Sequence, residues 1–320
     1  MINRVLVRSY IKQGSLLFLA CAAALFSFAW VRVWVVSLLD MGQFQTIVEQ
    51  FREFERFSPI RFDELFTYQG RVGLTFDEPI VILCTVVWCI SRGSDVVSGE
   101  INRGTMEMIL SQPISRVRLL WSHALVATGG LALLCLAVWV GLYLGVSLTT
   151  VEETVPRPAI EVPLFGFEIP LSFGEQTQAF PLEEKVDVRA FAAPTFNLFS
   201  FGFFLLGLTT LLSSFDRYRW RTIGLVMTIY VLQLVMFGLG KAAESLSWLE
   251  GMTFFNCYRP QGLSSLVTKG DLNSPWSLTT VMPESWFPPL VYPLLLIGMG
   301  IACYLGAARI FAKRDLPAPL

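Results

Sequence analysis

The chain has 320 residues, of which 54% are hydrophobic and only 15% are charged, and its formal net charge is -1. About a quarter of the residues in a soluble domain are charged, so this composition excludes an ordinary soluble protein and indicates a chain that lies in a lipid bilayer. The small net charge creates no overall field that would attract nucleic acid, so we expect no nucleic-acid partner.

Six segments are apolar over roughly 18 or more residues, which is enough to cross the hydrocarbon core as helices. Backbone groups find no water in that core, and the runs lack the alternation of barrel strands, so helices are expected. The predicted fold is all-α, a single polytopic domain over residues 1–320. The predicted spans are residues 15–39, 72–91, 119–147, 193–215, 222–240 and 288–311.

Residues 1–14 precede the first span and place apolar side chains on one helical face and Arg4, Arg8 and Lys12 on another. The pattern predicts a basic amphipathic helix in the headgroup layer, and the alternative is an ordinary positive flank of the first span. That span is too long for a cleaved signal peptide, so we expect it to be retained. Arg32 within it is expected to extend toward the membrane surface, with a functional role as the alternative.

Three longer connections, residues 40–71, 148–192 and 241–287, are expected on one side of the membrane. The first contains residues 44–57, whose apolar side chains recur every three or four positions and predict an amphipathic helix. The second is rich in Pro, Glu and β-branched residues, which favours short extended segments over a long helix. Tryptophans in the third are expected to anchor the chain at the interface.

The distribution of Lys and Arg indicates the orientation of the spans. Residues 1–14, 92–118, 216–221 and the tail after 311 carry more basic residues per length than the three long connections. Because basic loops stay in the cytoplasm, we expect both termini and residues 92–118 on the cytoplasmic side, and the three long connections outside.

The polar segment between the second and third spans, Ser91–Arg118, is more elaborate than a simple connection. A helix over Gly99–Leu110 would place Glu100 beside Arg103 and Arg103 beside Glu107 on one face. The pattern predicts a short, rigid helix with a charged side for a partner and an apolar side for its own membrane domain. The apolar side would be formed by Ile101, Met106, Ile109 and Leu110.

The run GEINRGTMEMILSQPISR, residues 99–116, resembles the signature of ATP-binding cassette (ABC) type-2 transporter permeases: a Glu, an Arg-Gly-Thr, a second Glu, a Leu pair, a Pro, a Ser and an Arg. Ile109 is a mild departure from the Leu pair. The resemblance extends to six spans with this coupling segment, residues 92–118, between the second and third. It implies contact with a separate ATPase subunit through Gly99, Glu100, Arg103, Gly104, Thr105, Glu107, Leu110, Pro113, Ser115 and Arg116.

The resemblance also implies a permease subunit in the plasma (bacterial inner) membrane that exports a substrate. Its expected partners are an ABC ATPase, a second permease that is identical or related, and membrane lipids. The sequence contains no Gly-x-x-x-x-Gly-Lys-Ser/Thr loop for binding phosphate. We therefore expect no cofactor on this chain, with ATP and Mg²⁺ bound by the partner ATPase.

Two other classes of function are alternatives to a transporter subunit. A membrane enzyme is disfavoured because the sole histidine, His123, excludes a His-Glu-x-x-His site, and no Gly-x-Ser-x-Gly elbow occurs. Asp77 and Glu78 are adjacent at one boundary and do not form a facing carboxylate pair, so no catalytic or metal site is expected. An ATPase-coupled anchor that does mechanical or signalling work on an extracytoplasmic partner is the second alternative.

Overall fold

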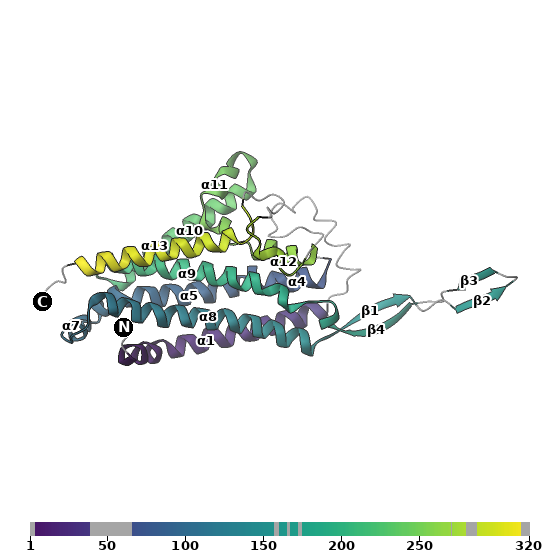
Figure 1. The fold of residues 1–320 in the computed structure, drawn as a ribbon, viewed down its shortest axis with the longest axis horizontal. Helices are drawn as coiled ribbons and strands as arrows, with labels where there is room; N and C mark the ends of the chain where they lie inside the picture. Colours follow the sequence, from purple (N-terminus) through teal and green to yellow (C-terminus); the bar gives the residue numbers. More distant parts are fainter. Residues whose placement is uncertain are drawn as a thin grey trace.

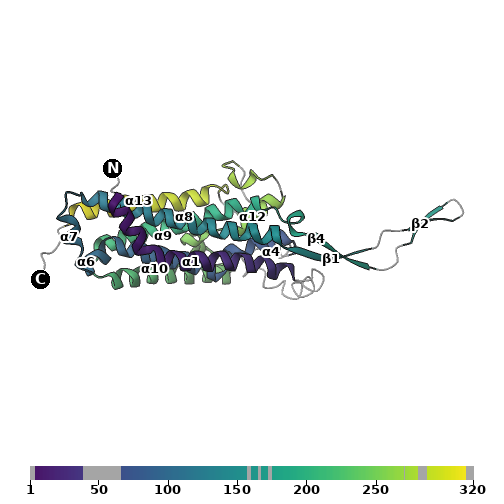
Figure 2. The ribbon, with the colours of Figure 1, turned by 90° about the horizontal axis from the view of Figure 1, so that it is seen from below.

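The fold is a bundle of long helices from which a narrow arm of β-strands projects at one end (Figures 1 and 2). Within the described residues, six helices are long and apolar enough to cross a membrane. The predicted all-α polytopic fold is thus confirmed. The computed structural model describes residues 4–38, 66–156, 160–164, 167–171, 175–269, 271–279 and 287–314.

The spanning helices follow the chain order expected from the apolar segments. They are α1 (Arg4–Ser37), α5 (Pro79–Ser94), α8 (Arg116–Leu148), α9 (Ala192–Phe215), α10 (Arg219–Ala242) and α13 (Val291–Lys313). The second span is extended by α4 (Tyr68–Gly73) and a 3₁₀ turn (Leu74–Asp77). Between α10 and α13 the chain forms α11 (Ser247–Gly251) and α12 (Pro260–Lys269). Pro79 begins α5 because the first helical position needs no amide donor.

Helix α9 lies at the centre of the bundle and packs against α13, α5 and α8, whereas α1 packs mainly against α8. Leu198, Phe201 and Leu205 on α9 are fully buried. Close packing of α9 on α13 depends on Gly207, because a Cβ atom there would lie 2.7 Å from the carbonyl oxygen of Gly300. Small residues therefore bring these two backbones together, as in other membrane bundles.

The described part of the N-terminal stretch, residues 4–14, is helical, but it does not form a separate element. Helix α1 is continuous from Arg4 to Ser37, and Figure 2 shows its N-terminal end at an angle to the rest. Tyr10 and Gly14 are buried, and a Cβ atom on Gly14 would lie 3.3 Å from the Arg92 side chain. The helix predicted over 1–14 thus continues into the first span, because its small and aromatic residues pack on the bundle.

Arg32 forms an ion pair with a carboxylate near the start of the second span. Its guanidinium lies 3.2 Å from the carboxylate of Glu78, the residue that precedes α5. This contact joins α1 to the start of α5 and gives both charges a structural partner.

The arm consists of two short antiparallel ribbons. Strand β1 (Thr150–Pro156) pairs with β4 (Glu175–Pro181), and β2 (Ile160–Leu164) pairs with β3 (Phe167–Leu171). The prediction of extended segments in this connection is confirmed. The amphipathic helix predicted over 44–57 lies outside the described residues.

We predict that Gly141→Val will destabilise the packing of α1 on α8. A Cβ atom on Gly141 would lie 2.7 Å from the Phe26 carbonyl oxygen and 2.9 Å from the Ala29 Cβ. Overpacking of this kind costs about 1–3 kcal/mol, which thermal unfolding in detergent would detect. Gly129→Val in the same helix is the matched control, because a Cβ atom there meets nothing within 4 Å. Equal stability of the two variants would contradict the close approach.

Candidate functional site: the coupling segment and its buried ion pairs

The coupling segment lies at the same end of the bundle as both termini, opposite the β arm (Figure 1). The segment includes the short helix α7 (Met106–Leu110), whose label marks this end of the bundle in Figure 1. An even number of spans requires both termini on one side, and the arrangement meets that requirement. We refer to this part of the molecule as the α7 end.

The single helix predicted over Gly99–Leu110 is wrong, because the chain turns in the middle of it. It forms α6 (Glu100–Asn102), reverses at Gly104, and continues as α7. Gly104 has a φ of 72°, a left-handed conformation that glycine adopts without the steric cost that other residues incur. Glu107 is exposed, and in the described part of the chain it makes no ion pair with Arg103.

Arg103 instead binds two carboxylates at once. Its Nη1 donates to Asp95 Oδ1 at 2.6 Å, and its Nη2 donates to Glu100 Oε1 at 2.9 Å. The predicted pair of Glu100 with Arg103 is therefore confirmed, and a second partner is added. Burial alone would lower the pKa of Arg103, but its hydrogen bonds and ion pairs with Asp95 and Glu100 outweigh that effect and raise the pKa.

Asp95 connects the coupling segment to two spanning helices. Besides Arg103, it lies 3.4 Å from Arg92 on α5 and 3.5 Å from Arg219 on α10. Only 3% of Asp95 is exposed, so water screens these interactions little. Arg103 is therefore connected through Asp95 to the ends of α5 and α10.

Asp95 lies at the start of a wide, π-helical turn, Asp95–Gly99, that follows α5. Such turns occur as single-turn insertions in α-helices, frequently at functional sites. The amides of Val97 and Ser98 both donate to the Ser213 hydroxyl of α9, at 3.3 and 2.9 Å. The Thr222 hydroxyl of α10 donates to Ser98 Oγ at 3.1 Å. Hydroxyl groups from two neighbouring helices thus hold the turn in place.

Arg92 extends the polar network to α1 and α8. Its Nη2 donates to the Tyr10 carbonyl oxygen at 3.4 Å and lies 3.3 Å from Nε2 of His123. The Tyr10 and His123 rings meet edge to face at 4.9 Å. His123 is therefore a packed, hydrogen-bonded residue, as expected for a lone histidine. No cluster of His, Cys, Asp or Glu suited to a metal occurs in the described parts of the chain.

The ten residues predicted to contact an ATPase divide into three groups by their exposure to solvent. Gly99 and Glu100 are buried, and the Glu100 carboxylate accepts hydrogen bonds from Arg103 and from the Thr105 hydroxyl. Glu100 therefore shapes the turn from inside, which corrects its expected place on an outward charged face. Half-buried positions are Thr105, Leu110 and Arg116, and exposed ones are Arg103, Gly104, Glu107, Pro113 and Ser115.

Met108 is a surface residue that the motif did not single out. It is 72% exposed, whereas Met106 is 2% exposed and Ile109 packs against the core. The apolar side predicted for the segment is confirmed, and Met108 lies on the opposite side of α7. Its position next to Glu107 and between the inward-facing Met106 and Ile109 was the available signal. Asp95 was also missed, although it follows Arg92 by one helical turn.

We predict that Asp95→Asn will destabilise the α7 end strongly. The substitution removes the charge that compensates Arg92, whose side chain is 4% exposed. Breaking a buried ion pair costs about 3–5 kcal/mol, and we expect the lower end because the amide oxygen still accepts one hydrogen bond. Unfolding in detergent would measure the change. Glu107→Gln also removes one negative charge from the segment and should stay within about 0.5 kcal/mol of the wild type; equal effects would exclude the role of Asp95.

Comparison with known proteins agrees with this geometry. The family model described as ABC-2 family transporter protein matches residues 7–316, which include the six spanning helices and the coupling segment. No curated protein is similar enough to count as a match. The resemblance seen in residues 99–116 is therefore confirmed over nearly the whole chain. The chain belongs to the ABC-2 transporter family, as a membrane-spanning permease subunit of an ABC transporter.

Proposed function

We propose that this permease couples ATP hydrolysis on a separate ATPase subunit to the export of a substrate across the plasma (bacterial inner) membrane. The observation that carries the proposal is an exposed surface at the α7 end whose base is tied to the spanning helices by buried ion pairs. We call this surface the coupling ridge; it comprises Arg103, Gly104, Glu107, Met108, Pro113 and Ser115.

The coupling ridge has the chemistry of a protein contact. Met108 offers an exposed, flexible apolar side chain next to the free carboxylate of Glu107. Methionine and arginine are enriched where proteins meet, and charges around an apolar centre fix the register of the partner. The ATPase would therefore rest on Met108, with Glu107 and Arg103 beside it.

Force would reach the membrane through the buried ion pairs. Pressure on α7 moves Arg103, and Arg103 is bonded to Asp95, which contacts Arg92 and Arg219. Because separating buried charges is costly, the connection transmits displacement and resists stretching. Closure of the ATPase pair would thus tilt α5 and α10 together and alternate the access of a central cavity.

The remaining partners follow from the same assembly. ATP and Mg²⁺ would bind to the ATPase, and a second permease, identical or related, would complete the pathway. Helix α10 leaves large apolar side chains exposed, and this surface suits membrane lipids and a second permease. The exposed side chains are Leu225, Met227, Val231, Leu232, Leu234, Val235 and Leu239.

The β arm favours a second candidate function. It projects far beyond the bundle at the end opposite α7 (Figure 1), and this projection supports contact with an external partner. An ATPase-coupled anchor that does mechanical or signalling work on that partner would need the arm.

An intramembrane enzyme is not favoured, because the carboxylate of Glu78 is engaged in an ion pair with Arg32.

We predict that a photo-cross-linking amino acid at Met108 will capture an ATPase in native membranes. The captured protein should contain the phosphate-binding loop that this chain lacks, identified by mass spectrometry. Leu133 on α8, 53% exposed, is the control position and should capture no ATPase. Met108→Asp should weaken co-purification of the ATPase at least tenfold, as expected for a central contact residue. Capture of no ATPase at Met108 would contradict the proposed coupling.

Shortening the arm separates the two candidate functions. Joining β1 directly to β4 by a two-residue turn removes β2 and β3 and leaves the bundle unchanged. Export should survive this change, because the arm lies outside the bundle. The measurement compares cells that carry the shortened chain with cells that lack the whole chain. If the shortened chain still restores the phenotype that is lost without the chain, export is supported. If the phenotype is not restored although the ATPase still co-purifies, mechanical work on an external partner is supported.

A further inference from the structure

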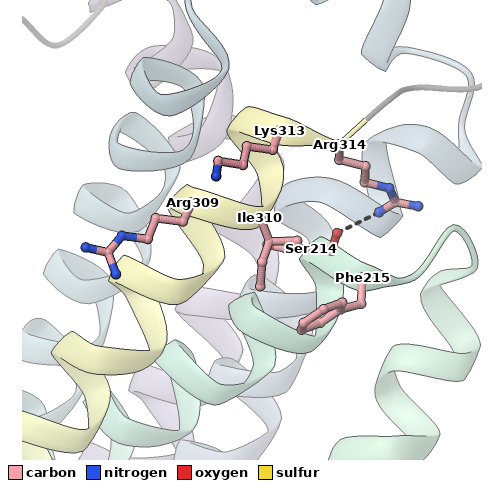
Figure 3. Close-up of a pocket in the computed structure, with 6 residues that line it drawn as sticks. All are labelled: Ser214, Phe215, Arg309, Ile310, Lys313 and Arg314. Carbon is pink, nitrogen blue, oxygen red and sulfur yellow. Dashed lines mark hydrogen bonds between the residues drawn. The ribbon is translucent and has the colours of Figure 1, made fainter.

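A hollow of about 450 Å³ lies at the α7 end, on the side where α9 ends and α13 ends. It is lined by Ser214, Phe215, Arg309, Ile310, Lys313 and Arg314 (Figure 3). Half of these residues are cations. The hollow is separate from the coupling ridge, because it shares none of the ridge residues.

Arg314 fixes the geometry of the hollow. Its Nη1 donates to the carbonyl oxygens of Ser214 at 2.7 Å and Asp216 at 3.0 Å, which joins the end of α13 to the end of α9. Its own carbonyl oxygen accepts a hydrogen bond from Arg116. Burial lowers the pKa of Arg314 and the charge of Arg217 lowers it further, whereas the charge of Asp216 raises it. The hollow carries the positive charge of its three cations.

Arg309 and Lys313 supply that charge without a counter-ion among the described residues. They are four residues apart on α13, and Figure 3 shows both side chains extending to the same side of the helix. Like charges at this spacing repel each other on a helix surface. An anion bound by both side chains would relieve this repulsion.

The surface of α13 beyond the cations identifies the kind of anion. Ile301 and Leu305 continue the same four-residue spacing, and they are 47% and 49% exposed. The stripe thus changes from apolar to basic along the helix, in the order in which a phospholipid presents its acyl chain and its phosphate. Phe215, 62% exposed, lines the other side of the hollow, across α13 from the two cations (Figure 3). A soluble phosphate would need only the basic part.

We propose that this hollow binds an anionic phospholipid, with the phosphate between Arg309 and Lys313 and an acyl chain along Ile301 and Leu305. Basic pockets between spanning helices are suited to such headgroups. The bound lipid would neutralise the α13 cations and hold the ends of α9 and α13 together through one more contact. The site does not depend on the proposed coupling, since it can be tested without an ATPase.

Native mass spectrometry of the full-length chain would test the proposal, with phosphatidylglycerol and phosphatidylcholine of identical acyl chains as probes. The wild type should retain phosphatidylglycerol preferentially. Arg309→Gln with Lys313→Gln should weaken its binding about thirtyfold, because each cation near a membrane surface contributes about a fivefold factor. Arg309→Lys with Lys313→Arg should bind nearly as the wild type does, because both charges remain.

Arg8→Gln with Lys12→Gln is the matched control. It removes one Arg and one Lys at the same spacing and the same end of the bundle, from exposed positions on α1. Retained binding in this control supports a specific site, and an equal loss in both double variants would overturn it in favour of diffuse surface charge. Absence of any preference in the wild type, or full displacement by millimolar inorganic phosphate, would also overturn the lipid assignment.

Discussion

The ion pair between Arg103 and Asp95 is the interaction on which the α7 end depends. It connects the exposed coupling ridge to a carboxylate that is nearly inaccessible to water, at 2.6 Å. Buried charges persist only when they are paired, and removal of one partner leaves an uncompensated ion. Asp95 therefore requires its surrounding arginines, and those arginines come from the coupling segment, α5 and α10. The position of α7 relative to the membrane helices is set by this requirement.

Much of the architecture could be predicted because lipid imposes local rules. Continuous apolar runs give spanning helices, Pro79 begins one of them, and the region of β1 to β4 shows its extended character in its composition. The inward side of α7 was also predictable from its apolar positions. These features depend on neighbouring residues and on the surrounding lipid, so they can be predicted from local sequence patterns.

The pairing and burial of the charged residues in the site could not be predicted from local sequence patterns. Pairing Arg103 with Glu107 assumed an unbroken helix, and Gly104 ends that helix by adopting a left-handed conformation. Glu100 was predicted on the outward face of that helix, but the turn directs its side chain inward to Arg103. Arg219 lies far along the chain from Asp95, so no local pattern relates them. The sequence therefore located the segment, and tertiary contacts determined which of its charges are buried.

The π-helical turn at Asp95–Gly99 affects how the coupling segment can move. The turn contains one residue more than an α-helical turn, so its hydrogen-bond register is already displaced from that of α5. Passing this extra residue along the helix by one position would rotate only the residue that it passes, by roughly 100°, and would leave the helix on either side in place. No net loss of backbone hydrogen bonds is required for that step. Such a step would therefore change which backbone amides face the Ser213 hydroxyl, without moving α5 or α6 as a whole.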